Sequence, residues 1–99
     1  MKIVWTEPAR QDLRTLFTYI AEENPHAAKR VLAELQTRVE LLQDNPQLGR
    51  IGRVEGTREL VLKGTHYILP YRVKAQQIHI LAVLHTARAW PEDFNVGGE

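Results

Sequence analysis

The residues best suited to chemistry lie toward the C-terminal end of this chain, where His85 is followed three positions later by Arg88. A histidine can take up and return a proton near neutral pH, and guanidinium groups beside it can hold a phosphate. Arg72 is expected one strand away, so His85, Arg88 and Arg72 form the candidate catalytic set. The structural alternative is that His85 hydrogen-bonds at a strand end while Arg88 pairs with a carboxylate. We favour this alternative, because no second acid–base partner is evident.

No other catalytic or metal-binding arrangement is indicated. The remaining histidines, His26, His66 and His79, lack ligand spacing such as i and i+4 on one helix. The absence of cysteine excludes a disulfide or a thiolate zinc site and fits a reducing cytosol. The glycines within residues 47–56 do not lie between a strand and a helix, as a nucleotide-binding loop requires. We therefore expect neither a metal nor a cofactor.

Two amphipathic helices are predicted ahead of these residues. Apolar side chains recur every three or four positions over residues 8–23, and again from Pro25 toward Asn45. Asn24 is a good N-cap and Pro25 suits the first turn, whereas Pro46 disfavours helical geometry in the residue before it. The short connection predicts an antiparallel helical hairpin.

Strand patterns flank this hairpin. Residues 2–5 are a short apolar opening typical of an edge strand, and residues 58–63, 67–73 and 78–84 have strand patterns. Residues 47–56 are rich in glycine and arginine and are interpreted as a basic connecting loop. The order β-α-α-β-β-β predicts an α+β fold, with the helical hairpin packed on one face of a twisted, mainly antiparallel sheet. The other face is expected to be free for function.

Size and charge narrow the function classes. A chain of 99 residues is expected to form a single domain over residues 1–94, with a flexible tail at 95–99. No apolar run approaches the length of a membrane span, so we expect no membrane association. Residues 50–91 carry seven basic groups against two acidic ones, although the whole chain has a net charge of only +1. This imbalance favours an anionic partner, either nucleic acid or an acidic protein segment.

Three local patterns, in this order, carry a family resemblance: NPQLGR at residues 45–50, GTREL and HYILPYRV within 56–73, and IHILAVLHTARAWP at 78–91. With the element order, they resemble the RelE/ParE superfamily of toxins from bacterial type II toxin–antitoxin modules. The resemblance implies a cytoplasmic protein that arrests growth until a cognate antitoxin binds it. It also implies two exclusive mechanisms, because RelE-like members cleave mRNA on the ribosome and ParE-like members inhibit DNA gyrase.

The chain departs from the RelE-like pattern at three positions. RelE-like nucleases carry basic residues where this sequence has Glu59, Val61 and Ile68. An acidic or apolar side chain cannot stabilise the negative charge that develops on the phosphate during RNA cleavage. We therefore expect a ParE-like gyrase inhibitor rather than an enzyme. The alternatives are a ribosome-dependent mRNA endonuclease that uses His85, Arg88 and Arg72, and an interaction module that has lost toxicity.

The antitoxin is the partner that the resemblance implies most directly. An antitoxin of this kind has a disordered C-terminal segment that folds on the toxin, which predicts a hetero-oligomer. Arg50, Arg53 and Arg58 are the candidate antitoxin contacts, because an acidic segment would pair with them. Arg72 has a structural alternative of its own, as the cross-strand partner of Glu59.

Overall fold

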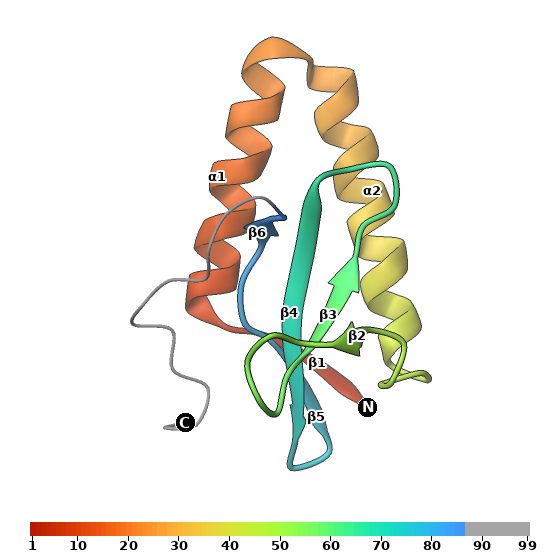
Figure 1. Cartoon of the computed structure of the whole chain (residues 1–99). Helices are drawn as coiled ribbons and strands as arrows, with labels where there is room; N and C mark the ends of the chain where they lie inside the picture. Colours follow the sequence, from red (N-terminus) through yellow and green to blue (C-terminus); the bar gives the residue numbers. More distant parts are fainter. Residues whose placement is uncertain (87–99) are drawn as a thin grey trace.

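The computed structural model describes residues 1–86 as two layers, a helical hairpin and a sheet (Figure 1). The helices are α1 (Glu7–Glu23) and α2 (Pro25–Leu42). The strands are β1 (Lys2–Trp5), β2 (Arg50–Ile51), β3 (Arg58–Val61), β4 (Tyr67–Lys74), β5 (Gln77–Ile80) and β6 (Leu84–His85). The predicted α+β fold is confirmed. Arg88 and the predicted tail at 95–99 lie outside the described residues.

Both helices begin where the sequence indicates. Thr6 is the N-cap of α1, and its hydroxyl accepts a hydrogen bond from the backbone N–H of Ala9 at 3.4 Å. Asn24 is the N-cap of α2, and its side-chain oxygen accepts from the N–H of Ala27 at 3.1 Å. Asn24 also ends α1, because its own N–H donates to the carbonyl of Ile20. One residue therefore makes the turn of the hairpin. Neither helix is long and apolar enough to cross a membrane.

The strands form one sheet in the order β1-β5-β4-β3-β2, and β6 pairs with the first residues of β4. The pairs are antiparallel except for β1, which runs parallel to β5 with Lys2 opposite Gln77. The expectation of a mainly antiparallel sheet with residues 2–5 at its edge is therefore confirmed.

The core lies between the sheet and the hairpin, which covers the face directed away from the viewer in Figure 1. Alternate strand residues point into it, as the period of two along a strand requires. The main buried side chains are Leu16, Leu35, Val39, Leu42, Leu60, Leu62, Leu69, Tyr71, Ile78 and Ile80. At about 1.5–3 kcal/mol for each fully buried aliphatic side chain, this layer supplies most of the driving force for folding.

The opposite face of the sheet is partly buried, which corrects the expectation that it is free. Ile68, Pro70 and Glu59 alternate with the core residues and point to this face, yet all three are almost fully buried. The segment that joins β2 to β3 passes over the same face (Figure 1). The part of this face that can meet a partner is therefore smaller than the alternation of residues suggests.

The prediction of a connecting loop over residues 47–56 is wrong at its centre, where β2 forms. Arg50 lies directly opposite Glu59, and Ile51 lies opposite Arg58. A strand of two residues leaves no alternation to detect, and its pairing depends on Glu59, nine positions away.

The predicted strand at 78–84 is interrupted between β5 and β6. The backbone N–H of Val83 donates to the carboxylate of Asp12 on α1 at 3.0 Å instead of joining a ladder. At the end of β5, the carbonyl of Ile80 accepts a hydrogen bond from the hydroxyl of Thr6 at 2.7 Å. Side chains of the α1 region therefore satisfy backbone groups that a continuous strand would have paired.

Candidate functional site

Three residues form a charged cluster on the sheet face that is turned away from the helices. The carboxylate of Glu59 is buried, with only 3% of its side chain exposed. One of its oxygens accepts a hydrogen bond from Nε of Arg50 at 3.0 Å and lies 3.0 Å from Nη2 of the same side chain. Its other oxygen accepts from the backbone N–H of Arg53 at 3.1 Å and lies 3.4 Å from the Nε of Arg53. Glu59 therefore ties β3 to β2 and to the segment that follows β2.

Arg58, the third predicted antitoxin contact, points to the other face. It neighbours Glu59 in β3, so its side chain projects toward the helix side, where it lies directly opposite Tyr71. Its Nη1 donates to the carbonyl of Gly49 at 2.8 Å. The structure thus brings Arg50 and Arg53 together and separates Arg58 from them.

Tyr71 holds the connection between α2 and β2 against the sheet. Its hydroxyl donates to the carbonyl of Pro46 at 2.7 Å and accepts from the N–H of Gly49 at 2.8 Å. Burial raises the pKa of the Tyr71 phenol above its ordinary value of 10.0, against the smaller opposing effects of Gly49 and Arg58. The hydroxyl is therefore neutral over the physiological range and able to make both bonds.

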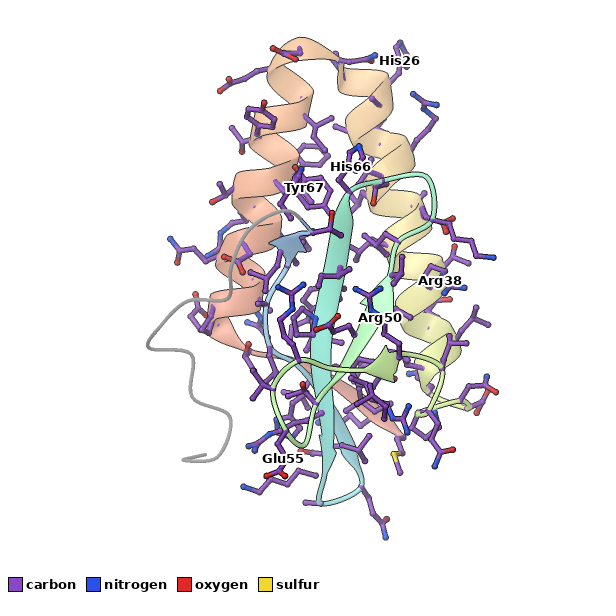
Figure 2. The ribbon with its side chains drawn as sticks, in the orientation of Figure 1. His26, Arg38, Arg50, Glu55, His66 and Tyr67 are labelled. Carbon is purple, nitrogen blue, oxygen red and sulfur yellow. The ribbon has the colours of Figure 1, made fainter. Side chains whose placement is uncertain are left out.

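His85 lies at the far end of β4 from this cluster. It pairs with Tyr67 across the sheet, and the two rings meet edge to face with their centroids 5.3 Å apart. The ring of His66 lies 5.6 Å from that of His85, and the carbonyl of His66 accepts from the N–H of Thr86 at 2.7 Å. Figure 2 shows His66 and Tyr67 at one end of β4 and Glu55 near the other.

Arg72 and His85, two of the three predicted catalytic residues, are not brought together. His85 shares the helix-facing side with its cross-strand partner Tyr67, whereas Arg72 alternates onto the other side and lies opposite His79. The five positions from Tyr67 to Arg72 span about 16 Å along a strand. Arg88 lies outside the described residues. Arg72 is also not directly opposite Glu59, because that position is held by Pro70.

Sequence reasoning missed the roles of Glu59 and Tyr71. An acidic residue among arginines is a signal for a shared ion pair, and Glu59 directly follows Arg58. Exposed Glu55 gives the same signal, so the sequence does not single out Glu59. Tyr71 gives no such signal, because its partners Pro46 and Gly49 are more than 20 positions away.

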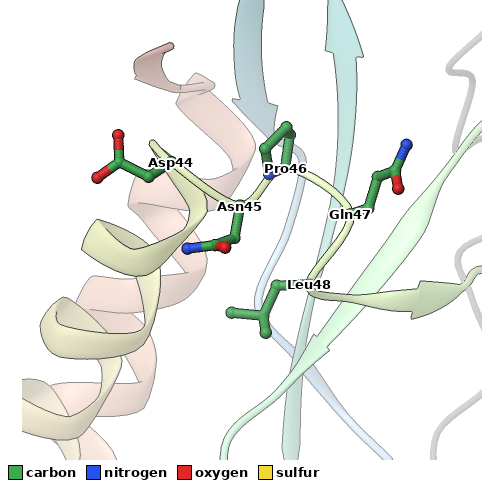
Figure 3. Close-up of a pocket in the computed structure, with 5 residues that line it drawn as sticks. All are labelled: Asp44, Asn45, Pro46, Gln47 and Leu48. Carbon is green, nitrogen blue, oxygen red and sulfur yellow. The ribbon is translucent and has the colours of Figure 1, made fainter.

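Residues 44–48 line an open pocket of about 410 Å³ between the end of α2 and β2 (Figure 3). Asp44 is the only charged residue of this lining, so the lining offers no pair of titratable groups for acid–base chemistry. Within residues 1–86, no three histidine or acidic side chains are grouped closely enough to hold a metal ion.

Comparisons with known proteins agree with this architecture. The profile of the ParE toxin family, described as the ParE toxin of the parDE type II toxin–antitoxin system, matches residues 3–90. The Sinorhizobium fredii protein Y4kP, named as a candidate toxin, is 42% identical over 91 residues, which cover 92% of this chain and 94% of the relative. Toxin RelE2 of Caulobacter vibrioides is 34% identical over 87 residues, covering 88% and 97%.

Two solved structures share the fold. A chain of the chromosomal ParDE toxin–antitoxin system of P. aeruginosa superposes with a TM-score of 0.77 at 30% identity, covering 86% of this chain and 95% of that one. A chain of the RelBE2 toxin–antitoxin complex of Mycobacterium tuberculosis gives a TM-score of 0.58 at 27% identity, covering 85% and 95%. The chain belongs to the ParE toxin family within the RelE/ParE superfamily, and it is a toxin of a type II toxin–antitoxin system.

Proposed function

We propose that this toxin acts in the cytoplasm as a ParE-like inhibitor of DNA gyrase, without cleaving RNA, and that a cognate antitoxin neutralises it. The proposal rests on the side chains found at two positions where RelE-like nucleases carry basic residues. Here Glu59 is a buried carboxylate held by two arginines, and Ile68 is fully buried. Neither side chain can stabilise charge on a phosphate.

The separation of His85 from Arg72 supports the same reading. A general acid or base must lie within about 3 Å of the proton that it moves, and the phosphate must contact its cations at the same time. Residues on opposite faces and about 16 Å apart along β4 cannot meet one phosphate together.

A supercoiling assay with the purified chain tests this proposal. Saturating toxin is expected to stop gyrase from supercoiling relaxed plasmid, and His85→Ala is expected to inhibit as strongly as the wild type. His26→Ala, at an exposed position on α2, is the matched control for replacing a histidine. Normal supercoiling at saturating, folded wild-type toxin would refute gyrase inhibition.

A ribosome-dependent mRNA endonuclease is the second candidate, favoured by the similarity to proteins named RelE2 and RelBE2. In this case His85 is the acid–base residue, and Tyr67 and His66 lie beside it. A translating extract with a defined mRNA is expected to show cleavage by the wild type and none by His85→Ala. Intact mRNA in the presence of the wild-type toxin eliminates this candidate.

We further propose that the partner is an antitoxin whose acidic segment binds the basic sheet face in a hetero-oligomer. The structural neighbours come from toxin–antitoxin systems. Arg50 and Arg53 would be the central contacts, with Arg58 at the margin because it faces the other side. Expression of the toxin alone is expected to stop bacterial growth, and coexpression of the adjoining reading frame is expected to restore it. Unimpaired growth with the toxin alone would indicate an interaction module that has lost toxicity.

A further inference from the structure

The Glu59 cluster has an unusual distribution of exposure. The carboxylate is 3% exposed, whereas the side chains of Arg50 and Arg53 are 56% and 41% exposed. A buried carboxylate therefore contacts the inner edges of two guanidinium groups whose outer parts remain open to solvent. In Figure 2, Arg50 lies over the sheet on the side facing the viewer.

Such an arrangement fixes the arginines before any ligand arrives. A free arginine side chain loses about 0.5–1.5 kcal/mol of conformational freedom when it is immobilised at an interface. Here Nε of Arg50 already donates to Glu59, and its Nη2 lies 3.0 Å from the same oxygen. Nε of Arg53 lies 3.4 Å from the other carboxylate oxygen. A guanidinium has five N–H donors, so Arg50 retains donors beyond those that Glu59 occupies.

We propose that Arg50 and Arg53 form a preorganised binding site for a carboxylate of the antitoxin's acidic segment, and that Glu59 is its positioning residue. The inference rests on the proposed neutralisation by an antitoxin and deepens it by naming the site. Planar guanidinium groups bind a carboxylate through paired hydrogen bonds, and this geometry requires that their orientation be held.

A protein carboxylate fits this site better than a nucleic acid does. Glu59 already compensates part of the charge of the two guanidinium groups that it contacts. Nucleic-acid binding depends on neutralising several phosphates along a strand with uncompensated cations. Partly compensated guanidinium groups with fixed donors match one carboxylate instead.

Replacement of Glu59 separates preorganisation from charge, because the two predict effects of opposite sign. Glu59→Gln removes a negative charge, so simple electrostatics predicts tighter binding of an acidic partner. Loss of positioning predicts weaker binding, and we expect the Kd to rise about tenfold, since two side chains must then be ordered on binding. Glu55→Gln is the matched control, because Glu55 is exposed on the segment between β2 and β3. It changes charge equally and is expected to leave the Kd the same or slightly lower.

Two lysine substitutions, Arg50→Lys and Arg53→Lys, keep the positive charge and remove the planar set of N–H donors. Both positions are exposed, so these variants disturb the surroundings of the buried carboxylate less than Glu59→Gln does. Each is expected to raise the Kd by roughly threefold to tenfold. Arg30→Lys, at an exposed position on α2, is the control and is expected to leave the Kd unchanged. Circular dichroism establishes that each variant is folded before its Kd is measured.

The assay is isothermal titration calorimetry of the purified toxin with the purified product of the adjoining reading frame. Weaker binding by Glu59→Gln and by both lysine variants, with unchanged controls, supports the site. Wild-type-like or tighter binding by folded Glu59→Gln, or full affinity in the lysine variants, overturns it while leaving neutralisation intact. Absence of binding by the wild type refutes the proposed antitoxin partner and this site with it. If single-stranded RNA displaces the partner from the wild type but not from Glu59→Gln, the site binds nucleic acid instead of a protein carboxylate.

Discussion

Replacing Tyr71 by phenylalanine removes one oxygen atom from the point where the chain between α2 and β2 is attached to the sheet. The ring remains in the core, so the packing of Tyr71 against its neighbours is retained. What disappears is the donor to the carbonyl of Pro46 and the acceptor for the N–H of Gly49.

The magnitude follows from the surroundings of these two groups. Gly49 is buried, so its N–H cannot turn to water, and an unsatisfied buried group costs about 1–3 kcal/mol. Pro46 is only partly buried, so its carbonyl can be hydrated and adds less. We expect Tyr71→Phe to lower the free energy of unfolding by about 2 kcal/mol. For a domain of this size, that corresponds to a fall in Tm of roughly 8–16 °C.

Urea unfolding followed by circular dichroism measures this loss. Tyr19→Phe is the matched control, because Tyr19 is 64% exposed and a surface change of this kind alters stability by less than about 0.5 kcal/mol. Amide hydrogen exchange gives a second readout, since the N–H of Gly49 is expected to exchange faster in Tyr71→Phe. If both tyrosine variants unfold within about 0.5 kcal/mol of the wild type, the two hydrogen bonds do not hold this connection and the reasoning fails.

Four further predictions concern the titration of Tyr71, its neighbour Gly49, the turn between β4 and β5, and Asp12. Stability should fall as the pH rises above about 10, because the folded state holds the phenol proton of Tyr71 more tightly than the unfolded state; urea midpoints of Tyr71→Phe should lack this component. Gly49→Ala should destabilise by about 1–3 kcal/mol in urea unfolding, because the added Cβ would lie 2.6 Å from a ring carbon of Tyr71. Ala75 and Gln76 both have positive φ between β4 and β5, so the double variant Ala75→Asn, Gln76→Gly should raise the Tm, with a gain of about 1 kcal/mol. Asp12→Ala should lower the free energy of unfolding by about 1–3 kcal/mol, measured by urea unfolding, because it removes the acceptor for a backbone N–H between β5 and β6.

The elements that the sequence predicted correctly are those whose signals are local. Asn24 and Pro25 mark the turn of the hairpin within two positions, and the apolar periodicity over residues 8–23 matches α1, which begins at Glu7. The strand pattern over residues 67–73 located β4 without any knowledge of its neighbours. The order of these elements was sufficient for the fold.

The features that the sequence did not predict depend on contacts between distant residues. The break before β6 requires Asp12, which is 71 positions from the N–H that it accepts. The distribution of charge in residues 50–91 indicated an anionic partner. The sheet face toward which each arginine side chain points, however, follows from the pairing of β2 with β3. The short strand β2 gives no pattern of its own, so the separation of Arg58 from Arg50 could not be inferred.

The parallel pairing of β1 with β5 has a consequence for synthesis on the ribosome. Lys2 is made 75 positions before its partner Gln77. At about 5–20 residues per second, β1 waits roughly 4–15 s before it can join the sheet. Closing so long a loop is also a slow step in folding. A nascent chain that is interrupted before β5 has no partner for β1, so premature termination yields a fragment with an incomplete sheet.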